Sequence, residues 1–512
     1  MLVVSAGFEW LFVHQGLSAM DEGWPLHAAM ELHDGKTLYD EVFWVFPPGH
    51  LLSAWIAYAL DPPGVVLARL LYAAFAVAAS VATLFVARRI MPADFALLAA
   101  LMVAVAAPRS HFEQLLFGYR YLAWSLVVLL FFHLRLVRDQ SRWLVPAGFF
   151  AGIALFFRLT PAFAVSVGVG VGLLAASRDP RRWLRDGLLF AGGLLLVWGP
   201  VLLWFQGSVG LERLWSEMVV RPVEMTALQS KPLPPILLRD LDRTMLSFAF
   251  ASIGFRLYWL LYAGLLGWLL YRWGRAVLAG ERFEDVFLLA FVVFGGVYFT
   301  RSVGRSDVPH LDSAIPPIAV LIAWGVSRLE RPGVALFERG GRSARYGACV
   351  AVLALWVFLY GSDRYLDRSA MMGDLPLASL SGEVRVRPRS LGQLVDRLVP
   401  VIQRYSDPDE EILVMTHAPL LHVLADRHSP GYSDIVMPGT FRDAAEERGF
   451  LERLRRRPPA VVVWPQEPFD RNPRRGLDRT APRLREWVLD HYETRYDDPV
   501  YRVMVPKGAP EP

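Results

Sequence analysis

The sequence predicts a polytopic α-helical membrane protein with about 11 transmembrane helices, followed by a soluble α/β domain. Two features of composition and one of patterning support this fold class. Of the 512 residues, 54% are hydrophobic and only 20% are charged, whereas a soluble chain carries about 25% charge. Residues 361–512 hold 47 Asp, Glu, Lys and Arg side chains, but the much longer segment 1–360 holds only 55. Long apolar runs recur through the first segment and end where the second begins.

Eleven apolar runs approach the length of about 20 residues that a helix needs to cross the hydrocarbon core. They lie at 1–17, 70–87, 93–107, 121–137, 143–157, 160–177, 186–206, 257–271, 285–300, 312–327 and 346–360. The continuous stretch 143–177 is too long for one span, and Arg158 and Pro161 interrupt it. This interruption predicts a tight hairpin between two spans.

The positions of arginine predict the orientation. The connections 88–94, 135–142, 178–185, 272–285 and 328–345 carry 17 arginines in 55 residues. The alternate connections (18–69, 108–120, 158, 207–256 and 301–311) carry 13 basic residues in 127. Because basic residues favour the cytoplasmic side, we expect the first set and the N-terminus inside, and the C-terminal tail outside.

Two domains follow from this pattern: a transmembrane module over 1–360 and an extracytoplasmic α/β domain over 361–512. The module has two long outside loops, 18–69 and 207–256. The apolar segment 48–60 is too short to span and predicts a helix in the membrane interface, and 207–256 is expected to be interfacial too. So much structure on one face indicates that the protein works there.

The C-terminal segment alternates between helical and strand patterns. We expect helices over 391–405, 418–426 and 483–492, and strands over 411–416, 460–464 and 501–505. The single cysteine, Cys349, excludes an intrachain disulfide and a cysteine-based metal site. Neither domain is basic enough to indicate nucleic-acid binding, and no phosphate loop, nucleophile elbow or internal repeat occurs.

The acidic pair Asp21-Glu22 directly follows the first span. Carboxylates at the lipid boundary are costly unless they bind a cation or a polar ligand, or transfer protons. Asp21 could act as a general base on an acceptor hydroxyl, and Glu22 could hold a divalent cation or orient the acceptor. The alternative is ordinary loop solvation or helix capping.

A second polar cluster lies between the ninth and tenth candidate spans and contains Arg301, Arg305, Asp307 and His310. The planar guanidinium matches phosphate oxygens, so this loop predicts a phosphate site at the membrane surface. The competing interpretation is a set of charged residues at the water boundary. Arg158, in the outer hairpin, is a further candidate for the same role.

The third candidate lies in the second outside loop, where His111 and Glu113 could supply a hydrogen-bond partner and another carboxylate.

These motifs, taken in order, resemble the GT-C superfamily of membrane glycosyltransferases. The acidic pair opens a long first outside loop, a small-residue helix follows (Leu26-His27-Ala28-Ala29-Met30), and then comes Phe46-Pro47-Pro48-Gly49. The late segment from Gly304 to Pro317 is similar to the corresponding loop of bacterial members of glycosyltransferase family 39, relatives of the protein mannosyltransferases. The resemblance covers most of residues 18–327.

The resemblance implies an inverting sugar transfer from a polyprenyl-phosphate donor to an acceptor hydroxyl, at the outer face of the bacterial cytoplasmic membrane. It implies catalytic roles for Asp21 and Glu22. The donor phosphate would bind Arg305, Arg301 and Arg158, and the substrates would contact His111, Glu113, Asp307 and His310. Asp21, Glu22 and Glu113 could hold a divalent cation such as Mg or Mn, although the sequence around Glu113 departs from the common form. The sugar and the protein, lipid or glycan acceptor stay open.

Two other classes of protein compete with this interpretation. A transporter or flippase of a lipid-linked saccharide would require charged or broken helices at mid-membrane, and most ionisable residues here fall at span ends. A binding or scaffold protein anchored in the membrane would not need eleven spans.

Overall fold

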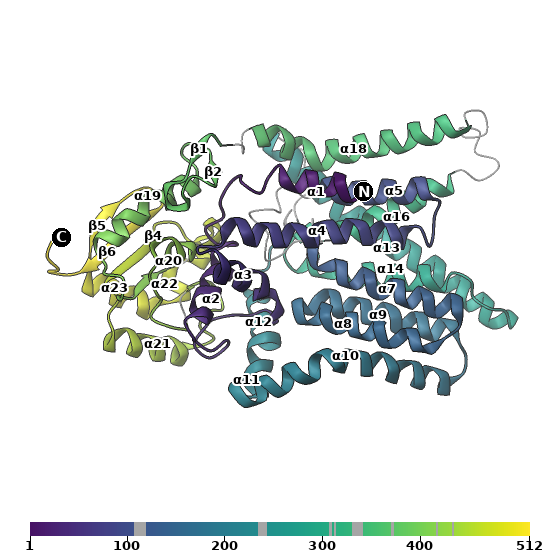
Figure 1. The fold of residues 1–512 in the computed structure, drawn as a ribbon, viewed down its shortest axis with the longest axis horizontal. Helices are drawn as coiled ribbons and strands as arrows, with labels where there is room; N and C mark the ends of the chain where they lie inside the picture. The colour runs from purple at the N-terminus through teal and green to yellow at the C-terminus, as the bar shows by residue number, and fades with distance from the viewer. Residues whose placement is uncertain are drawn as a thin grey trace.

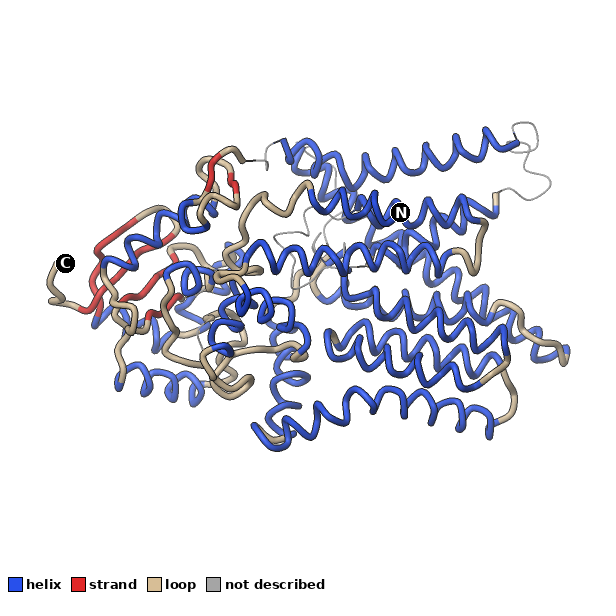
Figure 2. Tube along the Cα trace, viewed as in Figure 1, coloured by secondary structure: helices blue, strands red, loops and turns tan. Residues whose placement is uncertain are grey.

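The structure is a computed structural model that describes residues 1–106, 119–233, 243–306, 310–311, 314–329, 341–369, 373–415, 418–432 and 435–511. Long helices lie side by side in one bundle, and the C-terminal residues form a mixed domain against one end of it (Figure 1). The strands gather in that domain, as Figure 2 shows. The predicted fold class, a helical membrane module followed by an α/β domain, is confirmed.

Each of the eleven apolar runs corresponds to a helix. The helices are α1 (Leu2–Trp10), α4 (Val65–Ala87), α5 (Ala93–Ala106), α7 (Leu122–Arg138), α8 (Leu144–Phe157), α9 (Leu159–Ala176), α10 (Pro180–Ser208), α13 (Arg243–Ala279), α14 (Val286–Gly304), α16 (Ile315–Arg328) and α18 (Gly341–Ser369). Within the described residues, five are long and apolar enough to cross a membrane: α4, α9, α10, α14 and the Ile253–Ala279 part of α13. The apolar parts of α5, α8, α16 and α18 are shorter.

Several of the expected boundaries differ from those of the helices; α4, for example, begins at Val65, inside the expected loop 18–69. The run 1–17 is helical only over α1, because the chain then turns so that the carbonyls of Val13 and Gly16 accept hydrogen bonds from Arg69. The expected outside loop 207–256 overlaps α13, which begins at Arg243. The hairpin at Arg158 is confirmed: α8 ends at the preceding residue, α9 begins at the following one, and Arg158 itself is extended.

Short helices cover the end of the bundle that faces the C-terminal domain. They are α2 (Gly23–His33), α3 (Gly49–Leu60), α11 (Leu211–Trp215), a π-helical turn (Ser216–Val220) and α12 (Arg221–Leu228); two 3₁₀ turns lie at Tyr119–Tyr121 and Ser141–Trp143. Leu52, Trp55 and Leu60 of α3 are exposed, while Ala54 and Ala57 are fully buried. This one-sided exposure of apolar residues fits the interfacial helix that the sequence predicts.

The C-terminal domain is built on a four-stranded sheet of order β3-β4-β6-β5. Its strands are β3 (Ile412–Val414), β4 (Val461–Pro465), β5 (Tyr492–Asp497) and β6 (Tyr501–Pro506), with β3 and β4 parallel and the other pairs antiparallel. Leu413 pairs with Val462, Val463 with Val503, and Thr494 with Met504. A small hairpin, β1 (Leu375–Pro376) and β2 (Arg385–Val386), lies apart from this sheet.

Helices cover both faces of the sheet, which explains why β3 and β4 are apolar at every position. The helices are α19 (Leu391–Arg404), α20 (Leu420–Ala425), α21 (Ala444–Arg456), α22 (Leu477–Thr480) and α23 (Pro482–His491), with 3₁₀ turns at Ala378–Leu380, Phe469–Arg471 and Pro473–Arg475. Val414 and Val463 face the core that contains α19 and α20. Leu413 and Val462 face the core that contains α21 and α23. The expected helices and strands are all present, whereas β5, α21 and the β1–β2 hairpin were not predicted.

The C-terminal domain and the first outside loop share one hydrophobic core. Ala19 and Leu26 pack in the same cluster as Leu420 of α20, and the amide of Leu420 donates to the carbonyl of Ala19 across 3.2 Å. Gly23 approaches so closely that a Cβ atom there would lie 2.3 Å from the Leu420 nitrogen. Only glycine fits this position, and the domain is thereby seated directly on the turn that contains Asp21.

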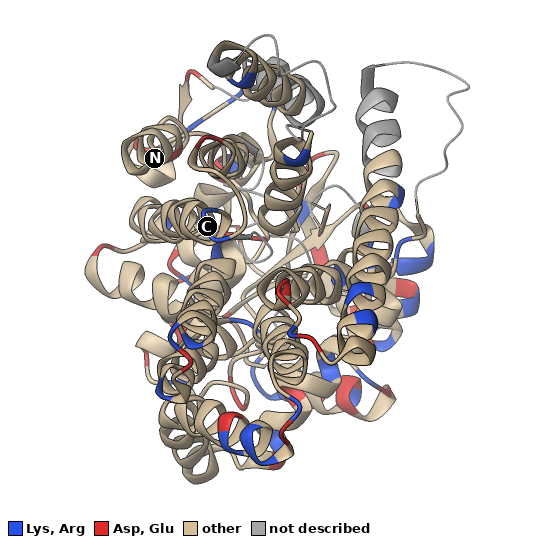
Figure 3. Ribbon diagram, turned by 90° about the vertical axis from the view of Figure 1, so that its right-hand side faces the viewer, with Lys and Arg blue, Asp and Glu red and all other residues tan. Residues whose placement is uncertain are grey.

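The arginine-rich connections lie at the opposite end of the bundle. Figure 3 views the molecule from that end, and Lys and Arg are prominent at the connections between helices. The described residues of the arginine-rich connections therefore gather at one end of the bundle, as a membrane orientation requires.

Candidate active site

The turn between α1 and α2 holds the acidic pair, and Glu22 anchors it. Glu22 is completely buried, and its carboxylate accepts hydrogen bonds from the Arg69 guanidinium and, at 2.8 Å, from the amide of Ser18. Arg69 lies in α4 and also donates to the carbonyls of Val13 and Gly16. The carboxylate of Glu22 therefore braces the backbone of the turn against α4.

Asp21 lies beside this brace but in a different environment. It is half-buried, and its amide donates to the hydroxyl of Ser18 across 3.1 Å. Because Ser18 and Glu22 are both fixed, the backbone at Asp21 is held rigidly at the end of the bundle beneath the C-terminal domain. This rigidity favours Asp21 as the residue that performs chemistry and Glu22 as the residue that positions it.

A chain of polar contacts leads from the acidic pair to Arg158. Tyr72 follows Arg69 by one turn of α4, and its hydroxyl donates to the carbonyl of His50 at 3.4 Å. The Nε2 atom of His50 lies 3.1 Å from a guanidinium nitrogen of Arg158. Tyr72 also interacts electrostatically with both Glu22 and Arg158. One face of α4 thus connects the candidate base with the candidate phosphate ligand.

Arg158 and Arg301 come together although they are far apart in sequence. Arg158 is buried, and its guanidinium lies over the ring of Phe46 at 4.8 Å from the centroid. Burial, and next the positive charge of Arg301, hold the pKa of Arg158 below its ordinary value. Arg301 contacts the hydroxyl of Tyr298 at 3.3 Å, one turn earlier in α14. The charges of the two guanidinium groups interact, and together they create a positive region that would attract a phosphate.

Arg305 lies at the end of α14, in the neighbourhood of α12. Its guanidinium donates to the side-chain oxygen of Gln229 at 3.3 Å, and its backbone pairs with that of Lys231. Gln229 in turn donates to the carbonyl of Pro438 in the C-terminal domain. His310 is fixed through its carbonyl, which accepts from the hydroxyl of Ser302 at 2.7 Å. The predicted residues His111, Glu113 and Asp307 lie outside the described residues.

The described residues do not offer a metal site of the expected kind. Within them, no three His, Cys, Asp or Glu side chains converge in an arrangement that could hold a metal ion. Glu22, expected as a ligand, has both carboxylate oxygens bonded to Arg69.

Several residues of this site carry little signal in the sequence. Arg69 is a lone arginine in an apolar run, and an unexplained buried charge of this kind is the signal that could have identified it. His50 gave no sign in the sequence of its contact with Arg158. Tyr72 carried no signal, because a tyrosine near a span end is common in membrane proteins.

The forked contact of Arg69 with Glu22 gives a testable expectation for stability. Arg69→Lys keeps the charge but loses the second hydrogen bond to the carboxylate and at least one backbone contact. We expect it to lower the free energy of unfolding by about 2 kcal/mol. The midpoint of thermal unfolding in detergent checks this, with exposed Arg88→Lys as the matched control. Equal midpoints for the two variants would show that the brace is not needed.

A second polar cluster lies where α2 meets the C-terminal domain. The buried carboxylate of Glu31 contacts Nε2 of His27 at 3.1 Å, the amide of Ser429 at 3.0 Å and Nδ1 of His428 at 3.4 Å. His27 stacks on His422, with ring centroids 4.1 Å apart. Burial opposes ionisation of Glu31, but its hydrogen bonds with His27 and His428, aided by the charges of His27 and Lys36, hold its pKa well below the ordinary value.

The two histidines of the C-terminal domain in this cluster should give opposite pH dependences. The hydrogen bond with Glu31 raises the pKa of His428 above 6.5, so its contribution is complete below pH 6.5 and is lost as pH rises through the raised value. Burial, and then the charge of His27, lower the pKa of His422 well below 6.5, so its contribution is complete above pH 6.5 and is lost on acidification.

We expect His428→Gln to remove the decline in stability that the wild type shows as pH rises above 6.5. The difference between the two proteins should be less than about 1 kcal/mol, because the side chain of His428 is partly exposed. His422→Phe keeps a ring for stacking and should flatten the loss of stability on the acid side. The midpoint of thermal unfolding from about pH 5.5 to about pH 8.5 measures both. Identical pH slopes in the wild type and both variants would contradict the assignment.

No family model matches the sequence, and no curated protein matches it either. Solved structures do match. ArnT from Cupriavidus metallidurans bound to undecaprenyl phosphate is 17% identical, with a TM-score of 0.56 over 99% of this chain and 98% of that one. The apo form of the same protein is 16% identical, with a TM-score of 0.53 over 98% and 96%. The chain therefore shares its overall fold with these two structures, and the match extends over nearly its whole length, including the C-terminal domain.

Proposed function

We propose that this protein is a membrane glycosyltransferase. It would move a sugar from a polyprenyl-phosphate donor to an acceptor hydroxyl at the extracytoplasmic face, with inversion at the anomeric carbon. The observation that carries the proposal is the connection, through one face of α4, between the turn of Asp21 and the buried guanidinium of Arg158. The positive charge of Arg301 acts on the same guanidinium. The shared fold with ArnT, which was solved with undecaprenyl phosphate, supports the class of donor.

The arginines would bind the donor phosphate and assist its departure. When the bond between the anomeric carbon and the phosphate oxygen breaks, negative charge accumulates on that oxygen. Arg158 and Arg301 are fixed before the reaction, so their positive charges stabilise this negative charge without rearrangement. Arg305 directly follows α14, one turn beyond Arg301, and would contact the donor from the side of α12.

Asp21 would act as the general base. As the acceptor oxygen attacks the anomeric carbon, its proton passes to the carboxylate of Asp21 and the polyprenyl phosphate leaves from the opposite face. A single displacement of this kind inverts the anomeric configuration. A positioned base accelerates such a step by about 10²–10⁴-fold, and Glu22 with Arg69 would position it.

The exposed apolar faces at the same end of the bundle would border the entry of the lipid donor. Leu211, Trp215 and Val223 of α11 and α12 are exposed, as are Leu52 and Trp55 of α3. In this proposal the protein spans the bacterial cytoplasmic membrane several times, with the transmembrane module over 1–360, the N-terminus inside and the domain 361–512 outside. That domain would cover the site and help to bind the acceptor.

The test is transfer of label from a radiolabelled polyprenyl-phosphate sugar in membranes that contain the protein. Chromatography of the products separates an acceptor-bound sugar from the intact donor. Appearance of labelled acceptor supports the enzyme, whereas movement of label across the membrane without transfer indicates a transporter or flippase. Membranes from cells that lack the protein are the control.

A further inference from the structure

A large cavity opens at the end of the bundle away from the candidate active site. Its volume is about 1050 Å³, and it lies between the ends of α7, α9, α13, α14 and α16 together with the turn after α4. The sugar-transfer site and the C-terminal domain are at the opposite end (Figure 1). Nothing in the proposed reaction uses this cavity.

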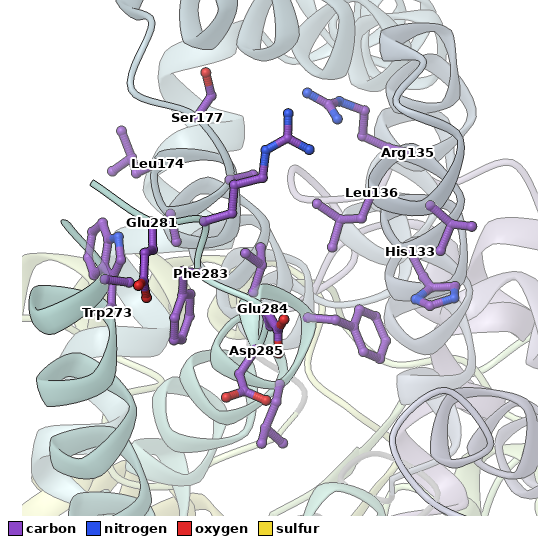
Figure 4. Close-up of a pocket in the computed structure, with 18 of the residues that line it drawn as sticks. His133, Arg135, Leu136, Leu174, Ser177, Trp273, Glu281, Phe283, Glu284 and Asp285 are labelled. Carbon is purple, nitrogen blue, oxygen red and sulfur yellow. The ribbon is translucent and has the colours of Figure 1, made fainter. Parts of the chain in front are cut away.

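The lining combines apolar side chains with a concentration of arginine. Figure 4 shows aromatic and aliphatic groups around the same space as charged ones: Leu136, Leu174, Trp273, Phe283, Arg135 and Glu281. The six arginines of the lining are Arg89, Arg135, Arg178, Arg182, Arg282 and Arg328. Four carboxylates also line the cavity (Asp139, Glu281, Glu284 and Asp285), so the lining keeps an excess of positive charge. A cavity with an apolar wall and this excess suits an amphiphile whose polar end is anionic.

Half of these arginines already have a structural role. Arg135 is buried and forms ion pairs with Asp186 at 2.8 Å and Asp139 at 3.1 Å, and Arg182 also pairs with Asp139. Arg178 donates to the carbonyls at the end of α13, including that of Ala276 at 3.1 Å. These three side chains fix the wall of the cavity.

The other three arginines have positive charge to offer a ligand. Within the described part of the chain, Arg89, Arg282 and Arg328 form no ion pair with a carboxylate, and all three are exposed. Arg328 lies over the ring of Trp324, at 5.1 Å from the centroid. Arg89, Arg282 and Arg328 come from three separate connections, yet all three line the same cavity. Membrane orientation alone would require only that arginines lie on the same side of the membrane.

We propose that this cavity binds the phosphate headgroup of an anionic lipid from the cytoplasmic leaflet. The three arginines would contact the phosphate oxygens, and the apolar part of the lining would contact the adjoining glycerol and acyl chain. Basic pockets between transmembrane helices on the cytoplasmic side are suited to such headgroups. The inference depends on the orientation given by the arginine distribution and is independent of the proposed sugar transfer.

The proposal is tested by native mass spectrometry of the full-length protein with equal amounts of phosphatidylglycerol and phosphatidylcholine. The wild type should retain phosphatidylglycerol preferentially, and replacement of Arg89, Arg282 and Arg328 by Gln should weaken this binding about tenfold or more. The matched control replaces Arg88, Arg142 and Arg275 by Gln. Those residues are exposed at the same end but do not line the cavity, so the control should bind like the wild type.

Three results would overturn the proposal. Equal loss of phosphatidylglycerol in both triple variants would show that general surface charge attracts the lipid. Unchanged binding in the cavity variant would place the lipid elsewhere. If millimolar inorganic phosphate displaces the lipid and raises the thermal midpoint as much as the lipid does, the cavity is a site for a soluble phosphate. Size-exclusion profiles and thermal midpoints of all three proteins confirm that they are folded.

Discussion

Asp21→Asn is expected to abolish sugar transfer while the protein inserts, folds and binds its donor normally. Asparagine has nearly the same shape as aspartate but cannot accept the proton of the acceptor hydroxyl at neutral pH. The amide of residue 21 still donates to Ser18, and the brace between Glu22 and Arg69 is untouched. The rate should fall about 10²–10⁴-fold, the contribution of a positioned general base. Transfer of radiolabelled sugar in membranes measures the loss.

The control for this variant lies in the same outside loop. Asp61→Asn removes an exposed carboxylate that directly follows α3, and we expect it to leave transfer unchanged. Binding of a polyprenyl phosphate to purified Asp21→Asn should equal that of the wild type, because the arginines are intact. Full transfer by Asp21→Asn would remove Asp21 from the mechanism, and loss of donor binding together with transfer would assign it to the binding site.

The helical fold was predictable because the bilayer imposes a strong constraint. A span must be apolar over most of its length, and its backbone groups must be satisfied within the helix, so every candidate run became a helix. The boundaries were less predictable where a single polar contact decides them. α1 stops early because Arg69, 56 residues away from Val13, takes the backbone carbonyls that follow it. No local pattern in the sequence reports such a distant partner.

The candidate site was predictable in its residue types but not in its geometry. The Asp21-Glu22 pair was identified as one unit, yet the structure separates the two: Glu22 is buried in contacts with Arg69, and Asp21 is only half-buried. Arg158 was a weaker candidate than Arg305, because its position in a hairpin says nothing about what it faces. Its interaction with Arg301 depends on how α9, which begins directly after Arg158, packs on α14, and packing of this kind is decided by tertiary contacts alone.

A similar limit applies to the segment between α10 and α13. Alternation of apolar and charged residues there predicted an interfacial position, and the exposed side of α11 and α12 agrees with it. The buried side holds Glu217 and Arg221, which are both fully inaccessible to solvent. The π-helical turn lies between α11 and α12 and contains Glu217. Insertions of this type are frequent at functional positions.

Arg221→Met should destabilise the protein more than Arg69→Lys or either histidine substitution. The Arg221 guanidinium donates to both carboxylate oxygens of Glu217, to the carbonyl of Thr440 at 2.7 Å and to Glu446 at 3.0 Å. Tyr432 donates to the same Glu217 carboxylate. Methionine would leave the buried carboxylate of Glu217 without its hydrogen-bonded arginine, with Arg213 and Arg442 remaining only at 3.6 Å. Breaking a buried ion pair of this kind costs about 3–5 kcal/mol. The midpoint of thermal unfolding measures this loss.

The same substitution should loosen the C-terminal domain over the candidate active site. Thr440, Tyr432 and Glu446 belong to that domain, and Arg221 fixes all three to the end of the bundle, directly or through Glu217. We therefore expect faster proteolytic cleavage between β3 and α21 in Arg221→Met. Arg213→Met is the matched control on the same segment, because Arg213 is partly exposed and lies 3.6 Å from Glu217. Its effect should stay below about 1 kcal/mol.

A double variant separates the electrostatic explanation from simple loss of packing. Glu217→Gln with Arg221→Met removes both buried charges, so the penalty for an unpaired carboxylate disappears and much of the stability should return. If the double variant is as unstable as Arg221→Met alone, the ion pair does not account for the effect. The double variant could also regain its thermal midpoint without regaining sugar transfer. That result would mean that the buried charges set the position of the domain over the site, in addition to their effect on stability.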